Sequence, residues 1–288
     1  MNDDLSPLPG TEVHYLRSEH VGDEFKVIIG HCHAPDRAAA SVLFLGDTWA
    51  NFGTAVEIIR LMRLSEVVPP LLVVGVGYRT TALDRLVALR ARDFTPSVAF
   101  SPGFDDAAMM GGADSFIAFV QDELKPWLRA RFPVDPDDSM SFGDSLGGLF
   151  ATYVLLSTPK TFLRYGIGSP SLWWDAGSMF AHEEQYAHAH DDLDARAFFS
   201  VGAHETLAGR RRFIDQLPAD RRARAEAEDA ADPPVDMVAD CERMVAALRG
   251  RAYRRLDVGL DVLPGEYHET APPVNLSRSL RYLFDAPH

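Results

Sequence analysis

One serine in this chain lies in a sequence pattern that can make it a nucleophile. Ser145 is the centre of Gly143-Asp144-Ser145-Leu146-Gly147, which has the form G-x-S-x-G and runs directly into an apolar segment. A sharp turn from a strand to a helix strains the serine backbone, and glycines on either side avoid collisions with both elements. The turn exposes the Ser145 hydroxyl, and the amide of Leu146, at the start of the helix, points to the same place and favours negative charge there. The pattern predicts a nucleophilic serine with half of an oxyanion hole.

A serine hydroxyl becomes reactive only when a base removes its proton, and that base needs an acid to orient it. His268 is the one histidine among ten that directly follows the last predicted strand. Glu205 follows the strand before it, so the chain order is Ser145, Glu205, His268. This is the order Ser, acid, His that is typical of α/β-hydrolases. We therefore expect Ser145 as nucleophile, His268 as base and Glu205 as the orienting acid.

The acid has competitors in the sequence. His204 stands beside Glu205, and Asp215 or Asp257 can also supply a carboxylate. Asp144 is adjacent to the nucleophile, but alternation along the strand turns its side chain away from that of Ser145. We expect Asp144 to orient neighbouring groups or to form the edge of a pocket.

The elements that must position these residues alternate between strands and helices. A strand, a helix and a second strand in succession predict a βαβ unit, and hence a mainly parallel sheet whose loops meet at the carboxyl edge. The first two strands alternate polar and apolar residues, as an antiparallel hairpin does. The prediction is a single α/β domain over residues 1–288, with helices on both faces of about eight strands at residues 12–17, 24–29, 41–45, 69–78, 139–142, 165–168, 197–201 and 258–263.

Several residues at the predicted carboxyl edge are candidates for contact with a substrate. The backbone amide of Asp47 or Thr48, just after a buried strand, can supply the second oxyanion donor. We expect Trp49, Trp173, Trp174 and Arg79 to bind substrate, although one of the adjacent tryptophans can equally pack in the core and the other lie on the surface. Residues 80–112, where helical periodicity fades, and residues 206–234, rich in Arg, Ala, Asp and Glu, are possible lid or flap insertions.

Composition excludes some classes of protein. The net charge is −14 at pH 7, which argues against binding to nucleic acid or to an anionic membrane, because both need clustered positive charge. The N-terminus lacks the apolar core of a signal peptide, and the apolar runs are too short to span a bilayer. Neither Cys32 nor Cys241 lies in a metal-ligand pattern, and the spacing of the histidines in residues 181–194 matches no standard metal site. We expect a cytoplasmic protein without cofactor, metal or disulfide, and the sequence leaves open whether it is a homo-oligomer.

The motifs together resemble one family. The elbow around Ser145, the run Ser169-Pro170-Ser171-Leu172-Trp173-Trp174-Asp175 and Gly265-Glu266-Tyr267-His268 are similar to the esterase family of α/β-hydrolases that includes enterobactin and bacillibactin trilactone esterases, the esterase D type and mycolyltransferases. The similarity extends from about residue 12 to residue 284. The resemblance implies Ser145 as nucleophile, His268 as base and Glu205 as acid. The chain departs from many of these relatives, which carry His where Asp144 stands.

The expected function is that of a serine esterase that forms an acyl-enzyme. An acyltransferase with the same triad, a siderophore trilactone esterase and a non-catalytic binding protein with a hydrolase fold are the alternatives. Iron-loaded catecholate siderophores are polyanions, and a chain with a net charge of −14 repels them unless an arginine cluster such as Arg79, Arg90 and Arg92 offsets the field. The charge therefore favours a neutral or modest ester as substrate.

Overall fold

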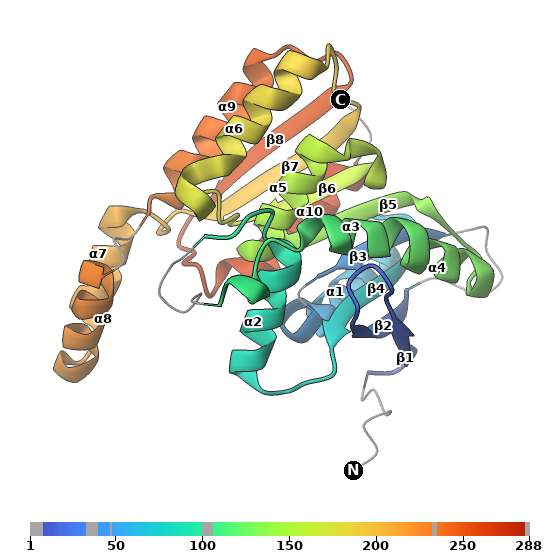
Figure 1. Ribbon diagram of the computed structural model, residues 1–288, viewed down its shortest axis with the longest axis horizontal. Coiled ribbons are helices and arrows are strands. Elements are labelled where there is room, and N and C mark those ends of the chain that lie inside the picture. The colour runs from blue at the N-terminus through green and yellow to red at the C-terminus, as the bar shows by residue number, and fades with distance from the viewer. Residues whose placement is uncertain (1–7, 33–39, 47, 100–105, 232–234, 286–288) are drawn as a thin grey trace.

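A computed structural model describes residues 8–32, 40–46, 48–99, 106–231 and 235–285. Within these residues eight strands form one sheet in the order β1-β2-β4-β3-β5-β6-β7-β8 (Figure 1). The first two strands pair antiparallel, β2 pairs antiparallel with β4, and every other pair is parallel. The strands are β1 (Thr11–Arg17), β2 (Glu24–Cys32), β3 (Ala40–Leu45), β4 (Leu71–Tyr78), β5 (Val134–Asp144), β6 (Arg164–Gly168), β7 (Ala195–Gly202) and β8 (Leu256–Leu263).

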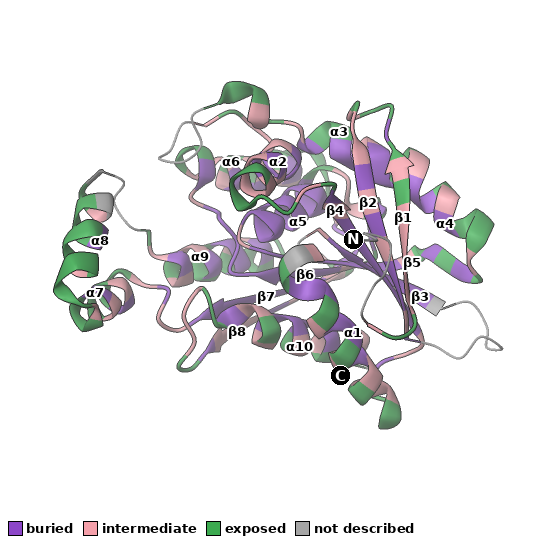
Figure 2. Ribbon diagram, turned by 90° about the horizontal axis from the view of Figure 1, so that it is seen from below, coloured by how far each residue is buried: buried purple, intermediate pink, exposed green. Residues whose placement is uncertain are grey.

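Helices cover both faces of the sheet, and the sequence of the central strands requires this. In β3, Val42 and Phe44 belong to the core on one face, whereas Leu43 and Leu45 belong to the core on the other. A strand that is apolar on both sides must be buried on both sides. Two helices, α1 and α10, lie on one face, and most of the others lie on the opposite face (Figure 2). The predicted mainly parallel sheet with an antiparallel N-terminal hairpin is therefore confirmed.

The helices follow the strands in the order that a parallel sheet needs. Four of them matter most for the site: α5 starts directly after β5, α7 follows β7, α10 follows β8, and α1 follows β3. Among the described residues no helix combines the length and the apolar character needed to cross a membrane. The helices are α1 (Thr48–Leu64), α2 (Leu83–Phe94), α3 (Ala113–Ala118), α4 (Lys125–Arg131), α5 (Leu146–Ser157), α6 (Trp174–Ala189), α7 (Leu207–Gln216), α8 (Ala219–Ala231), α9 (Met237–Gly250) and α10 (Ala271–Phe284).

Residues 80–112, where the sequence shows little helical periodicity, contain the helix α2. Its inward side carries Leu89, Ala91 and Phe94, but also Asp93, which is fully buried. Asp93 accepts hydrogen bonds from Arg92 (2.7 and 3.0 Å) and from the hydroxyl of Tyr78 (3.0 Å). A buried ion pair interrupts the apolar stripe, and this interruption hid the helical periodicity in the sequence.

The charged segment after β7 folds into two helices that extend away from the rest of the molecule. Figures 1 and 2 both show α7 and α8 side by side at one end, beyond α9. Most of their residues are exposed, and the exceptions include Ile214 and Ala225. The described part of residues 206–234 thus consists mainly of two largely exposed helices, and its role as a lid or flap stays a prediction.

Candidate active site

The backbone of Ser145 has the strained conformation of a nucleophile elbow. Its φ is 58° and its ψ is −118°, a region that residues with a side chain rarely adopt. A Cβ atom on Gly143 would lie 2.5 Å from the carbonyl group of Gly147, so the turn closes only because residue 143 is glycine. Ser145 is the residue between β5 and α5, and its N–H donates to the carbonyl of Gly168 (3.0 Å). The predicted strand-turn-helix at this serine is therefore present.

Glu205 and His268, separated by 62 residues in the chain, meet at the same edge of the sheet. His268 Nδ1 donates to Glu205 Oε2 at 2.6 Å. The other carboxylate oxygen of Glu205 accepts from Ser169 Oγ (2.6 Å) and from the backbone N–H of Gly202 (2.7 Å). The Glu205 side chain is only 2% exposed, whereas that of His268 is 41% exposed. The acid is thus fixed inside the protein, and the imidazole reaches the surface of the site.

The environment of His268 makes it a stronger base than a free histidine. Burial of the ring opposes a positive charge, but the hydrogen bond that His268 donates to Glu205 and the negative charges of Glu205, Glu269 and Asp144 outweigh this effect and raise the pKa of His268 above its ordinary value. With Nδ1 bound to a carboxylate, Nε2 is the nitrogen left to accept a proton. This is the tautomer that a general base next to a hydroxyl needs.

Ser145 and Glu205 are connected through the segment that follows β6. The Ser145 hydroxyl lies 3.3 Å from that of Ser171, and the N–H of Ser171 donates to the carbonyl of Ser145 (3.1 Å). Two residues earlier, Ser169 donates to Glu205. The structure thus places Ser145 beside a loop that also holds the acid. All three residues follow carboxyl ends of strands, as the sequence predicts.

The competing acids lie elsewhere. Asp257, at the start of β8, accepts from Arg196 (2.6 Å) and belongs to the opposite edge of the sheet. Asp215 is on α7 and pairs with Arg211 (3.3 Å). The ring of His204 stacks on Tyr267 with centroids 4.5 Å apart. Among these candidates, Glu205 is the one that the structure hydrogen-bonds to His268.

Asp144 is held inside the protein by two asparagine side chains. Its carboxylate accepts from Asn275 Nδ2 (2.8 Å) and from Asn51 Nδ2 (3.0 Å), and the residue is 6% exposed. Asp144 is therefore buried, and its charge contributes to the raised pKa of His268, while its orienting role stays a prediction. It does not line the pocket beside His268.

Of the two residues predicted to donate to the oxyanion, Leu146 and Asp47, the structure describes only Leu146. Leu146 is the first residue of α5, and the N–H groups of a first helical turn have no acceptor within their own helix. The position of Leu146 at the start of α5 is compatible with its predicted role as a donor, which stays a prediction. Asp47 lies outside the described residues, and so does the side chain of Trp49, although its backbone belongs to α1. Both of these assignments stay predictions.

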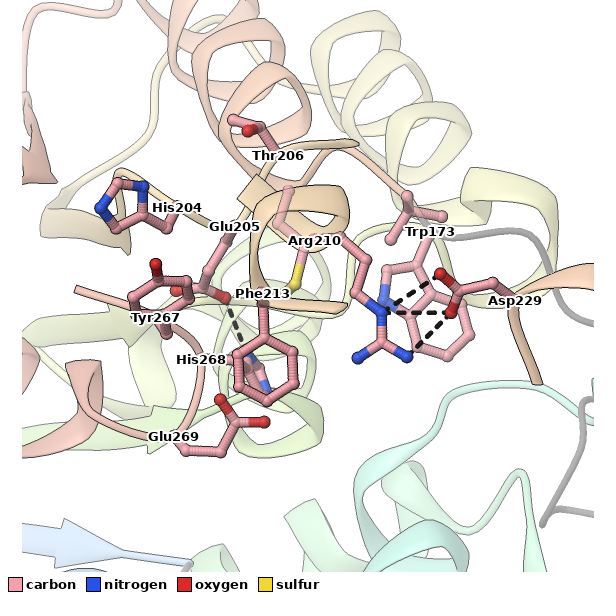
Figure 3. Close-up of a pocket in the computed structure, with 12 residues that line it drawn as sticks. Trp173, His204, Glu205, Thr206, Arg210, Phe213, Asp229, Tyr267, His268 and Glu269 are labelled. Atoms are coloured by element: carbon pink, nitrogen blue, oxygen red, sulfur yellow. Dashed lines mark hydrogen bonds and ion pairs between the residues drawn. The ribbon is translucent and has the colours of Figure 1, made fainter. Parts of the chain in front are cut away.

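A pocket of about 270 Å³ opens beside His268 and Glu205 (Figure 3). Aromatic side chains from three segments form its apolar walls: Trp173 before α6, Phe213 on α7 and Tyr267 next to the histidine. Arg210 of α7 and Asp229 of α8 also line it, and their side chains form an ion pair with a shortest distance of 2.8 Å. The pocket therefore combines a large apolar surface with a charge pair that joins α7 to α8.

Two of the residues expected to bind substrate do not line this pocket. Trp174 is fully buried, and its indole N–H donates to the carbonyl of Ser97 (3.2 Å), so it is a core residue. Arg79 pairs with Glu24 of β2 and lies over the ring of Tyr15 of β1. It is therefore near the β1–β2 end of the sheet, away from β7 and β8. Of the adjacent tryptophans, therefore, one packs in the core and the other, Trp173, faces the pocket.

The arginine cluster considered for an anionic substrate is largely neutralised. The guanidinium of Arg92 donates to Asp93 and to Asp23 (2.8 Å). Arg79 is paired with Glu24.

In the part of the chain that the structure describes, no three His, Cys, Asp or Glu side chains gather as metal ligands. Cys32 and Cys241 are both buried, and burial raises the pKa of each thiol, that of Cys32 to about 11.

Sequence reasoning missed the residues that support the acid and the nucleophile. Ser169, Asn51 and Asn275 each bind a buried carboxylate across a long sequence distance. Arg210 and Asp229 become pocket residues only because α7 and α8 pack side by side. Ser169 stands in the run that resembles the family, which was the one available signal. For the others, no local pattern distinguishes them from ordinary polar residues.

Comparison with known proteins identifies the family. Residues 30–232 match the family described as "Putative esterase". The ferri-bacillibactin esterase BesA of Bacillus subtilis is 35% identical over 177 residues, which are 58% of this chain and 61% of that relative's length. The siderophore triacetylfusarinine C esterase of Aspergillus fumigatus is 27% identical over an alignment of 298 residues that covers 97% of this chain and 94% of that one.

Solved structures show the same fold over nearly the whole chain. The BES protein from Bacillus cereus superposes with a TM-score of 0.74 at 25% identity, covering 99% of this chain and 100% of that one. The siderophore hydrolase EstB from Aspergillus nidulans gives a TM-score of 0.80 at 24% identity, with 99% of each chain covered. These comparisons confirm the α/β-hydrolase fold. The chain belongs to the putative esterase family, as the sequence motifs predict.

Proposed function

We propose that this protein hydrolyses a carboxylic ester through Ser145, His268 and Glu205. The observation that carries the proposal is the 2.6 Å hydrogen bond from His268 to the buried Glu205, at the sheet edge where the elbow exposes Ser145. An acid that is fixed by Ser169 and by the amide of Gly202 holds the imidazole in one tautomer.

In this mechanism His268 Nε2 takes the proton of Ser145 as Oγ attacks the ester carbonyl. The amide of Leu146 donates to the oxyanion, and the amide of Asp47 or Thr48 is the second donor that we propose. Glu205 stabilises the imidazolium that forms. His268 then gives its proton to the leaving alcohol, and water, deprotonated by the same imidazole, releases the acyl group from Ser145.

The substrate that we propose is a siderophore ester. Support comes from the relatives, since the two named above are a ferri-bacillibactin esterase and a triacetylfusarinine C esterase. The apolar pocket formed by Trp173, Phe213 and Tyr267 suits an aromatic or aliphatic acyl arm. The net charge of −14 and the paired arginines still favour the less anionic members of this class.

A substrate panel tests this function. We expect hydrolysis of p-nitrophenyl esters and of a cyclic trilactone siderophore, and loss of at least about a thousandfold in kcat/KM for Ser145→Ala, because a triad without its nucleophile keeps only binding and oxyanion stabilisation. An unchanged rate in Ser145→Ala contradicts the proposal. An added alcohol that appears in the product as a new ester would identify an acyltransferase instead.

A further inference from the structure

A second cavity lies on the same edge of the sheet, apart from the pocket beside His268. Its volume is about 370 Å³, within the range of small-molecule sites. Residues of β2, β4, α1 and α2 line it, together with the loop after β3. The lining residues on which its chemistry depends are Lys26 and Ile28 of β2, Thr48 at the start of α1, Tyr78 of β4, and Leu83 and Leu86 of α2.

The sheet order places this cavity and the pocket beside His268 on opposite sides of the nucleophile. Ser145 follows β5, the pocket lies at the ends of β7 and β8, and the second cavity lies at the ends of β3 and β4. Leu45 pairs with Phe142, so Gly46 is level with the start of the elbow. Gly46 lines the second cavity and also a small internal one that reaches Gly147, two residues after Ser145. Gly46, a lining residue of the second cavity, is therefore level with the elbow along the strands.

The charges of the two sites differ. Among the described residues that line the second cavity Lys26 is the charged one, and no described acidic side chain pairs with it. Its neighbour in β2 that has the opposite charge, Glu24, pairs with Arg79 instead. In the pocket beside His268, by contrast, Arg210 is paired with Asp229, and Glu205 and Glu269 add negative charge.

A second polar group in this cavity also lacks a partner. The hydroxyl of Thr48 is buried and makes no hydrogen bond in the part of the chain that the structure describes. A buried hydroxyl without a partner is unfavourable, and a ligand oxygen that accepts from it removes this cost. Gly77 makes room for the hydroxyl, because a Cβ atom there would lie 3.2 Å from Thr48 Oγ1. An ammonium and a hydroxyl, both donors, thus share one largely apolar cavity.

We propose that this cavity binds an anionic end group of the substrate, a carboxylate or a phenolate, on an arm remote from the ester that Ser145 cleaves. Lys26 Nζ and Thr48 Oγ1 donate to its oxygen atoms, and Ile28, Leu83 and Leu86 contact the apolar part of the arm. The proposal rests on the proposed function, because it assigns a subsite to the same substrate. It makes Lys26 a specificity-determining residue.

The test compares two series of p-nitrophenyl esters. One series contains monoesters of dicarboxylic acids with increasing chain length, and the other contains the matching neutral monocarboxylic esters. The measured quantity is the ratio of kcat/KM for the anionic ester to that for the neutral ester of equal length. We expect one chain length to be preferred in the wild type, and Lys26→Met to lower the ratio there about tenfold, mainly through KM, because a charge-assisted hydrogen bond is lost.

Two further variants keep this test specific. Lys160→Met removes an exposed lysine before β6, at the opposite edge of the sheet, and must leave the ratio at its wild-type value. Thr48→Val removes only the hydroxyl and lowers the ratio by about threefold, in line with a hydrogen bond that involves one neutral partner. A ratio that does not depend on chain length in the wild type, or that is equal in Lys26→Met and Lys160→Met, overturns the subsite.

The subsite and the proposed function fail in different ways. If Ser145→Ala still hydrolyses both series, the proposed function is wrong whatever the ratio shows. If hydrolysis requires Ser145 but the ratio is the same in all lysine variants, only the subsite is wrong.

Discussion

The two ends of β5 carry aspartates in opposite situations. Asp144, at the carboxyl end, is 6% exposed and accepts from two asparagine amides. Asp138, near the amino end, has a side chain that is 40% exposed and accepts from Ser41 and Arg164, each at 2.5 Å. Each accepts from two described side chains, so these hydrogen bonds do not distinguish them. Burial does.

The same difference extends along the whole sheet. At the amino edge, Arg164 pairs with Asp138 and Arg196 with Asp257, and each pair is partly exposed to water. Such pairs change stability little, because water screens them. At the carboxyl edge, Glu205 is 2% exposed and oriented by three donors. Buried carboxylates held toward a histidine are therefore the feature that separates the catalytic edge from an edge that is merely charged.

The largest expected effect breaks the catalytic edge. Glu205→Gln keeps the size of the side chain but removes the charge that stabilises the imidazolium, so we expect kcat to fall by about 10²–10⁴. The matched change at the amino edge, Asp257→Asn, removes the carboxylate bonded to Arg196, and we expect kcat within about twofold of the wild type. Steady-state kinetics on one p-nitrophenyl ester measures both. Equal losses in the two variants would remove the distinction between the edges.

A second pair of substitutions compares the two aspartates of β5 through stability. Asp144→Asn turns an NH₂ group toward Asn51 or Asn275, both of which donate, so a buried donor loses its acceptor and unfolding becomes easier by about 2–3 kcal/mol. Asp138→Asn, at a partly exposed site, costs below about 1 kcal/mol. Urea unfolding followed by circular dichroism gives both values. If Asp138→Asn is the more destabilising change, burial is not what separates the two ends.

The smallest expected effect sharpens the electrostatics of the catalytic edge. The raised pKa of His268 means that the base is protonated, and inactive, up to a higher pH than a free imidazole, so kcat/KM rises with pH through an inflection above 6.5. Glu269→Gln removes one of the charges that raise this pKa and moves the inflection to lower pH. Glu242→Gln, an exposed change on α9, is the control and leaves the inflection in place. An inflection that moves upward in Glu269→Gln contradicts this account.

Sequence patterns predicted most of the scaffold because the core imposes them. Continuous apolar runs gave the central strands, and the glycines around Ser145 gave the elbow, since both reflect local steric or burial requirements. Helix α2 was not predicted because Asp93 occupies an inward position, paired with Arg92, so the buried side of the helix is not apolar throughout. A search for apolar periodicity cannot detect a buried position that is occupied by a charged residue and its ion-pair partner.

Residues of the site could be predicted where chain order and the ends of strands determine their position. They could not be predicted where contacts between distant parts of the chain determine it. His268 and Glu205 follow strand ends, and the structure joins them by a hydrogen bond. The roles of Trp173 and Trp174 could not be separated in advance, because adjacent residues differ only in which one the tertiary packing buries. The supporting donors Asn51, Ser169 and Asn275 come from distant elements, so only the folded chain identifies them.

Labelling with a fluorophosphonate tests the central claim most directly, because the reagent reacts with a serine only when a base activates it. We expect mass spectrometry to find one modified residue, Ser145, in the wild type, with labelling abolished in Ser145→Ala and strongly slowed in His268→Gln and Glu205→Gln. Modification of a different residue, or labelling of Ser145 at the wild-type rate without His268, would contradict the proposed triad.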